Sequence, residues 1–354
     1  MDLVSALRTH AAATALAQQA SGSIAALAMW TANKGILGAA GAIPAIVAAM
    51  AAHPGADEAS AQLHEESCAA LRNLAANHAA NKDAIAACGG VEAIVGSMRT
   101  HLLSPVNQLH AAGALWNVPA NNAANKARVA QCGGIQCLLA ALNAHPDDSE
   151  VQLECIGALR NLSTLVENKP LILGANAIPV ILASMRRMMP VALLQEQACA
   201  LTFNLSNYSQ DAGASVLSLI EQDAPATVLQ VLQTHIASPH VVEEAAAALW
   251  IMHKAATGVV WPEAVRAQVL ALADQALAMH AQSQGVFNFT TGMKAAWSQP
   301  NPTATTASAA ATNGQPNGHG HGFVKPVQTD SNGVMADHNS ASPQRVHTGG
   351  DHRA

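Results

Sequence analysis

Three short sequence signatures recur along most of the chain at one spacing, and this regularity constrains the fold more than any other feature. The first is an aliphatic residue followed three positions later by His, at His10, His53, His101, His145, His235 and His280, with Met188 in the missing place. The second is Asn-Lys, which begins at Asn33, Asn81, Asn125 and Asn168. The third is a lone Asn, at Asn73, Asn117, Asn161 and Asn204. All three recur every 43 to 48 residues, which is a period typical of helical repeat arrays.

Within each unit the apolar residues follow the period of an α-helix. The clearest stripe occupies positions i, i+3, i+4 and i+7, at Ile135, Leu138, Leu139 and Leu142. Gly precedes most of these stripes and Pro follows them, as expected where one helix ends and the next begins. Each unit is therefore predicted to contain a short first helix that starts at Asn-Lys, a Gly turn, a second helix that ends at the recurrent His, and a longer third helix that carries the lone Asn.

Composition favours the same fold and narrows the class of partner. Aromatic residues make up only 3% of the chain and Ala is abundant, which favours closely packed helices over strands. Residues 1–285 hold 13 Lys and Arg against 20 Asp and Glu. Such an acidic array lacks the basic footprint that binds phosphate backbones, so nucleic acid is not an expected ligand. If charge selects partners, it selects basic ones.

Residues 69–98, 113–142 and 157–185 resemble armadillo repeats, because they combine an ALxN motif, the Asn-Lys start and the Gly turn. The resemblance is strongest from about 54 to 207. It implies an all-α, right-handed superhelical solenoid of about six repeats. We expect residues 1–285 to form the array, with a partial N-terminal cap, repeats ending near 53, 101, 145, 188 and 235, and a degenerate C-terminal cap to about 280. Residues 286–354, rich in Asn, Pro, Thr, Ser, Gly and His, are expected to be disordered.

The resemblance also implies a binding site. In armadillo proteins the third helices line a concave groove, and the Asn of the motif holds the backbone of an extended partner peptide. By this resemblance the ladder here is Asn73, Asn117, Asn161 and Asn204. A side-chain amide suits the task because it offers a donor and an acceptor to any peptide unit. The alternative is that these amides tie the third helices to neighbouring loops.

Residues before each Asn on the same helical face extend this hypothesis. Seven positions earlier stand Glu66, His110, Glu154 and Gln197, and four positions earlier stand Ala69, Gly113, Gly157 and Ala200. Glu66 and Glu154 would favour Lys or Arg on a floor of small residues. The small residues could equally serve only to let helices approach. Trp116, directly before Asn117, is either the rim of a groove or a packing residue between units.

The overall prediction is a non-catalytic scaffold that binds a protein partner, without cofactor or metal. No phosphate-binding loop, nucleophile elbow or metal quartet appears. Nuclear import receptors carry Trp four positions before the groove Asn, where this chain has small residues, which argues against that function. Two alternatives remain: an armadillo-type regulator of a small GTPase, and a structural component of a cytoskeletal or ciliary assembly. No apolar stretch is long enough to span a membrane. Six Cys without a paired framework predict a reducing compartment, the cytoplasm, with the nucleus left open.

Overall fold

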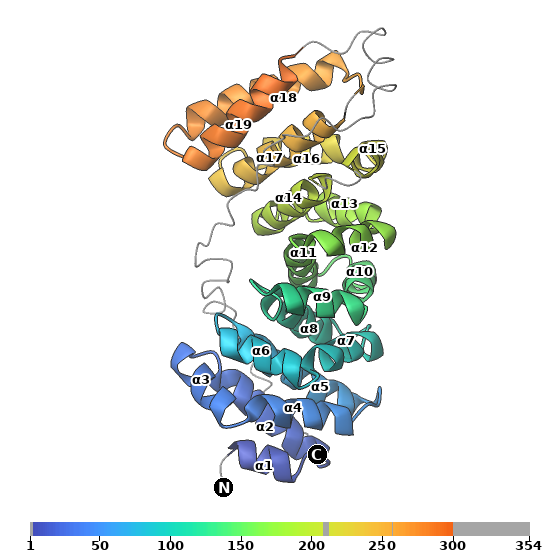
Figure 1. The fold of residues 1–354 in the computed structure, drawn as a ribbon, viewed down its shortest axis with the longest axis vertical. Helices are drawn as coiled ribbons and strands as arrows, with labels where there is room; N and C mark the ends of the chain where they lie inside the picture. Colours follow the sequence, from blue (N-terminus) through green and yellow to red (C-terminus); the bar gives the residue numbers. More distant parts are fainter. Residues whose placement is uncertain (1–2, 208–211, 257, 300–354) are drawn as a thin grey trace, which may run out of the picture. The chain divides into compact units, whose positions relative to one another are not determined.

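The computed structural model describes residues 3–207, 212–256 and 258–299. These ranges contain helices and no strand, and the helices stack as units in chain order (Figure 1). The first helices of the units are α3 (Thr31–Ala39), α6 (Ala79–Ala87), α9 (Ala123–Gln131), α12 (Lys169–Gly174) with the 3-10 turn η1 (Val166–Asn168) before it, and α15 (Ala212–Glu221). The second helices are α1 (Leu3–Thr9), α4 (Ala42–Ala52), α7 (Gly90–Thr100), α10 (Gly134–Ala144), α13 (Ala177–Arg187), α16 (Ala224–Thr234) and α18 (Glu263–Met279). The third helices are α2 (Thr14–Leu27), α5 (Glu58–Ala75), α8 (Pro105–Asn117), α11 (Ser149–Ser163), α14 (Ala192–Ser206), α17 (Pro239–Ala255) and α19 (Gln284–Trp297).

The turn between first and second helices requires a left-handed residue. Gly41, Gly89 and Gly133 take this conformation, with φ of 84°, 83° and 84°, because Gly has no Cβ to clash there. In the next two units the same place is filled by Asn176 (φ 56°) and Asp223 (φ 65°), two residue types that tolerate this region better than most. The helical unit predicted from the sequence is therefore present, although its turn is not always Gly.

Four of the recurrent His residues that end second helices link their helix to the unit before. Because a carbonyl oxygen can only accept, the ring Nε2 must carry the proton and donate it. The four bonds run from His53 to Ala11 O (2.9 Å), from His145 to Leu102 O (2.7 Å), from His235 to Met189 O (2.7 Å) and from His280 to Ile236 O (2.7 Å). The signature that marks the period is thus a bond between neighbouring units.

The Asn-Lys signature makes bonds in both directions. Lys82 Nζ donates forward to Ala120 O, just beyond the end of α8, at 3.1 Å. Asn81 Nδ2 donates backward to Lys34 O (3.0 Å) and Leu74 O (2.9 Å), on the first and third helices of the preceding unit. The Asn-Lys pairs at the start of α9 and α12 make equivalent bonds. The signature therefore holds these first helices to the preceding unit and to the turn that leads into the next one.

The third helices form a continuous row, in which each contacts the next from α2 through α5, α8, α11, α14 and α17 to α19. Their apolar stripes are fully buried, as at Leu71, Leu115 and Leu159. No unit could bury these faces alone, so the array is stabilised collectively through its interfaces. Within the part of the chain that the structure describes, no single helix is both long and apolar enough to cross a membrane, and only the pair α3 and α4, bent by 71°, passes that test together.

The predicted boundary between array and tail at 285/286 is wrong, because α19 extends to Trp297 and belongs to the packed array. Trp297 is fully buried. Its Nε1 donates to Leu249 O at 3.4 Å, and its ring lies 4.7 Å from that of Trp261 and 4.8 Å from that of His253, centroid to centroid. The remainder of the predicted tail, residues 300–354, lies outside the described residues.

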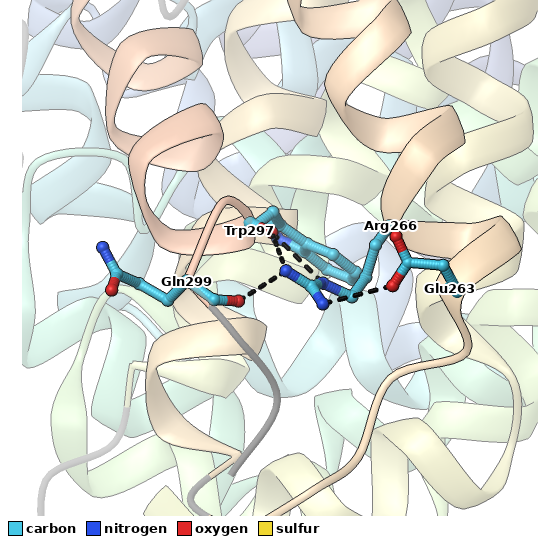
Figure 2. Close-up of polar contacts among 4 residues, drawn as sticks. All are labelled: Glu263, Arg266, Trp297 and Gln299. Carbon is cyan, nitrogen blue, oxygen red and sulfur yellow. Dashed lines mark hydrogen bonds and ion pairs between the residues drawn. The ribbon is translucent and has the colours of Figure 1, made fainter.

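Arg266 on α18 holds the end of α19 in place (Figure 2). Its Nε and Nη2 donate to Trp297 O at 3.3 and 3.2 Å, and Nη2 also donates to Gln299 O at 2.5 Å. Nη1 contacts Glu263 Oε2 at 3.3 Å. Carbonyls at a helix end have no partner within the helix, so a guanidinium is well suited to satisfy them.

We expect replacement of Trp297 by Ala to lower the free energy of unfolding by about 3–5 kcal/mol, because it empties a fully buried aromatic site. The matched control is Phe287→Ala on the same helix, where the side chain is 52% exposed, and its effect should stay within about 0.5 kcal/mol. Urea unfolding followed by circular dichroism measures both. Equal effects of the two substitutions would show that α19 is not part of the stable array.

Candidate binding face of the third helices

The predicted ladder lies on four consecutive third helices, and each Asn side chain is half-buried. Each amide Nδ2 donates to the preceding third helix. The acceptors are Ala25 O for Asn73 (2.9 Å), Arg72 O for Asn117 (3.1 Å), Trp116 O for Asn161 (2.9 Å) and Ser163 Oγ for Asn204 (2.9 Å). The amides therefore do tie units together, through neighbouring third helices instead of loops.

This tie uses only part of each amide. A side-chain amide has two N–H donors and an oxygen with two lone pairs. Among the described residues, the four ladder side chains make no hydrogen bond other than the one to the preceding third helix. One N–H and the Oδ1 of each amide are left for water or for a ligand, so the structural tie and the binding role are compatible. We call the four Asn, with the residues four and seven positions before each, the third-helix face.

Arg72 crosses this face. It starts on α5, passes α8 at Gly113, and forms an ion pair with Glu154 on α11. A Cβ on Gly113 would lie 2.5 Å from Arg72 Nε, so the small residue makes room for a neighbour's side chain. Glu154 is only 3% exposed. The carboxylate predicted to attract a partner's cation is therefore already paired within the chain.

Burial sets the protonation of the groups around this ion pair. It raises the pKa of Glu154 to about 7, and the Arg72 guanidinium opposes this shift. It lowers the pKa of His110 to about 4, and the nearby positive charge of Arg72 adds to that shift. His110 Nδ1 is buried without a hydrogen-bond partner. At neutral pH His110 is therefore an uncharged ring beside a charged guanidinium.

Trp116 is buried, with 7% of its surface exposed, and its indole covers Gly157 on the next third helix. A Cβ on Gly157 would lie 2.5 Å from the ring. One unit further along, Arg160 Nη1 donates to Gln197 Oε1 at 3.0 Å. The residue before each of these Asn thus reaches forward along the row, and for Trp116 the structure shows packing between units and not an open rim.

Glu66 differs from Glu154. It is half-buried, and its carboxyl lies against α2, since a Cβ on Gly22 would be 2.9 Å from Oε2. Burial raises the pKa of Glu66, and the neighbouring charge of Glu65 raises it further. The ion pairs found among the described residues do not include it. Of the two predicted carboxylates, Glu66 is the one without a cation.

Sequence reasoning missed the pairing of Arg72 with Glu154 because the two residues are 82 positions apart. A signal existed in the repeat. Arg occupies the position before the ladder Asn in two units, and the opposite charge of Glu154 stands seven positions before Asn161. Comparing charges between units, and not only within one helix, would have suggested the contact.

The thiols of this array are poorly suited to nucleophilic chemistry. All six Cys are free. Burial raises the pKa of Cys68 to about 12 and also raises the pKa values of Cys155 and Cys199, and a protonated thiol is a weak nucleophile. In the described ranges no three His, Cys, Asp or Glu side chains gather as metal ligands would.

Comparison with known proteins places this geometry in a class. The sequence model of the Armadillo/beta-catenin-like repeat matches residues 122–164. A search of curated protein sequences finds no match. An engineered protein of known structure aligns with a TM-score of 0.67 at 19% identity, over 88% of this chain and 72% of that one.

Two further structures share the fold. A designed armadillo repeat protein in complex with the peptide (KR)4 aligns with a TM-score of 0.54 at 16% identity, over 72% of this chain and 99% of that one. A chain from a structure concerning a phosphorylation switch in the interaction between cadherin and beta-catenin aligns with a TM-score of 0.61 at 19% identity, over 84% of this chain and 69% of that one. The fold is thus that of a helical repeat solenoid. The chain has the armadillo fold, and residues 122–164 match the armadillo repeat, which confirms the resemblance seen in its sequence.

We expect Gly157→Ala to destabilise the array by about 1–3 kcal/mol, because the new methyl group would collide with the indole of Trp116. Gly96→Ala on α7 is the control, since its Cβ would meet nothing within 4 Å, and it should stabilise by about 0.5–1 kcal/mol through helix propensity. Chemical denaturation distinguishes them. Gly157→Ala with wild-type stability would mean that Trp116 does not pack on Gly157.

His110 should make the array less stable in mild acid. Folding lowers the pKa of the His110 ring from 6.5 to about 4. As the pH falls below 6.5, this ring therefore binds a proton in the unfolded chain but not in the folded chain. Between pH 7.5 and pH 5 this costs about 2 kcal/mol. His110→Gln, which copies Gln197 at the equivalent place, should remove that part of the loss.

Denaturant unfolding of both proteins at the two pH values gives the difference directly. Other groups that titrate in this range, such as Glu154, are common to both proteins and cancel to first order. Identical pH dependence of wild type and His110→Gln would contradict the buried, uncharged state of this ring.

Proposed function

We propose that the array is a non-catalytic scaffold that binds an extended, basic segment of a partner protein along the third-helix face, in a reducing compartment such as the cytoplasm. The observation that carries this proposal is the ladder of four Asn on consecutive third helices, each with an N–H and an oxygen left over. The armadillo fold supports it, since scaffolds for protein partners commonly use this fold.

The spacing of the ladder fits an extended peptide. Packed helices lie about 8–10 Å apart, and an extended chain covers about 3.3 Å per residue. One ladder Asn would therefore meet every third residue of the peptide. Because each amide offers a donor and an acceptor to the peptide backbone, this contact is independent of the partner's side chains.

Charge supports a basic partner. The range 1–285 carries seven more acidic than basic residues. Glu66 brings to the third-helix face a carboxyl that pairs with no cation among the described residues. The designed armadillo protein that shares the fold is in complex with (KR)4, a peptide of alternating Lys and Arg. We therefore propose Lys and Arg as the side chains that this face prefers.

The ladder alone is too weak to hold a partner. Four Asn contacts at about 1 kcal/mol net each supply about 4 kcal/mol, whereas a micromolar complex needs about 8 kcal/mol. Contacts with the partner's side chains must add the remainder. Ion pairs with the carboxyl groups of the face are the most direct source.

The test is binding of a fluorescent (KR)4 peptide, followed by fluorescence anisotropy. We expect Asn117→Ala combined with Asn161→Ala to weaken binding about 30-fold, because two Asn contacts of about 1 kcal/mol net each are lost. The double variant should also be less stable, since each amide ties two third helices. Binding is therefore measured at a temperature where all variants are folded.

The matched control is Asn125→Ala. This residue lies on the first helix α9 and donates to Lys82 O (3.4 Å) and Val118 O (3.2 Å), so its loss weakens contacts between units without touching the third-helix face. We expect wild-type affinity for this control, and weaker binding of a (DE)4 peptide to every variant. An affinity that is unchanged in the double variant, or that falls equally in the control, would refute the proposal.

A further inference from the structure

The ion pair of Arg72 with Glu154 differs from the others that the described residues form. Its side chains are 12% and 4% exposed, whereas Arg128 with Glu92 is 41% and 45% exposed. The pairs Arg187 with Asp147, Lys294 with Asp274 and Arg266 with Glu263 each include a carboxylate that is more than half exposed. Of these five pairs, the one between Arg72 and Glu154 has the least exposed charges.

The fold does not need such a pair at this place. Taking two charges out of water costs several kcal/mol for each ion, so a buried ion pair often contributes little net stability. Arg160, at the equivalent position two units later, donates instead to the uncharged side chain of Gln197 on the adjacent third helix. One array thus contains both arrangements, and the uncharged partner suffices for packing.

The path of Arg72 follows the expected path of a ligand. The side chain leaves α5, passes over Gly113 of α8 and ends on α11, so it runs along the row of third helices and across the face. Gly113 lies one helical turn before Asn117, and Glu154 lies two turns before Asn161. A peptide bonded to both ladder residues would pass directly beside the guanidinium.

We propose that Arg72 occupies a subsite for a basic side chain, formed by Glu154 over the floor of Gly113, and that a partner's Arg or Lys takes its place there. This inference rests on the proposed function and names its specificity-determining residue. Binding then exchanges one ion pair for another, so Arg72 lowers the affinity for every basic partner and selects those whose other contacts are strong enough to displace it.

The protonation state of Glu154 determines the pH at which binding is measured. The charged groups that face Glu154 are Arg72 from α5 and Glu150 from its own helix, and His110 from α8 faces Arg72 and is uncharged at neutral pH. Burial already raises the pKa of Glu154 to about 7 in the presence of Arg72. Without that guanidinium the pKa would rise further, and the carboxyl must be ionised to bind a cation. Binding is therefore compared at pH 8.5 and at pH 6.5.

The key variant is Arg72→Met, which keeps an unbranched side chain over Gly113 and removes the charge. We expect it to bind (KR)4 about tenfold more tightly than wild type at pH 8.5, with a smaller gain at pH 6.5. Adding Glu154→Gln to this variant should abolish the gain. The matched control is Arg160→Met, which removes the same charge from the equivalent position, where the partner Gln197 is neutral; its affinity should change less than twofold.

The outcomes separate this inference from the proposed function. If wild type binds (KR)4 through its ladder Asn but Arg72→Met binds no more tightly than Arg160→Met, the subsite is refuted and the scaffold stands. If neither wild type nor any variant binds (KR)4, both are refuted.

Arg72→Met leaves a buried carboxyl without its cation and could lose its fold, so a second measurement uses wild-type protein. The Nε–H resonance of Arg72 is assigned by NMR from its loss in the Arg72→Met, Glu154→Gln double variant, in which both charges are gone. If a Lys or Arg of the peptide takes the place of Arg72 beside Glu154, this resonance shifts when (KR)4 binds. A bound complex in which it does not shift would overturn the proposal.

Discussion

The structure depends on hydrogen bonds that polar side chains of one unit make to backbone carbonyls of the next. A helix leaves its last four carbonyls without partners, and a short helix of nine residues, such as α6 or α9, leaves a large part of its backbone in that state. His145 bonds to Leu102 O in the turn that follows α7 of the preceding unit, and Lys82 bonds to Ala120 O in the turn that follows α8 and leads into the next unit. Apolar burial makes the units adhere, whereas these bonds define the register in which they stack. A solenoid built in this way has no central core whose loss would be decisive, and its stability resides in its interfaces.

This constraint explains how much of the fold could be predicted from sequence. The three recurring signatures are side chains that bond to neighbouring units, so their period reports the geometry of stacking, and the helices follow from it. The prediction failed where it used composition in place of period. Residues 284–297 contain few aliphatic residues, yet Val286, Met293 and Trp297 recur on one helical face and are buried. Turn residues were also less uniform than expected, because Asn176 and Asp223 can take the conformation that Gly has elsewhere.

The candidate site was predictable to the level of a helical face but not to the level of a contact. The period places Asn117, Glu154 and Trp116 on the third helices. It does not say whether a long side chain extends toward a ligand or toward the next helix, because both directions are open to a flexible chain on the same face. Arg72 and Trp116 extend to the next helices, and the small residues Gly113 and Gly157 are where they pass. Two of the four small residues that could have formed a floor for a ligand, Gly113 and Gly157, are thus covered by the array's own side chains.

In the proposed scaffold the same atoms would serve cohesion and recognition, and this links the two properties. An Asn that donates one N–H to the preceding helix holds its remaining groups in a fixed orientation, which lowers the entropy that a partner peptide must overcome. Arg72 acts in the opposite sense, since its ion pair with Glu154 must open before an outside cation can reach the carboxylate. Affinity on such a surface depends on the difference in free energy between the contact with the partner and the contact within the chain that it replaces. Substitutions at Arg72 or Gly113 would change that difference without changing any residue that a partner first meets, so the specificity of an armadillo-type face can lie in side chains that appear purely structural.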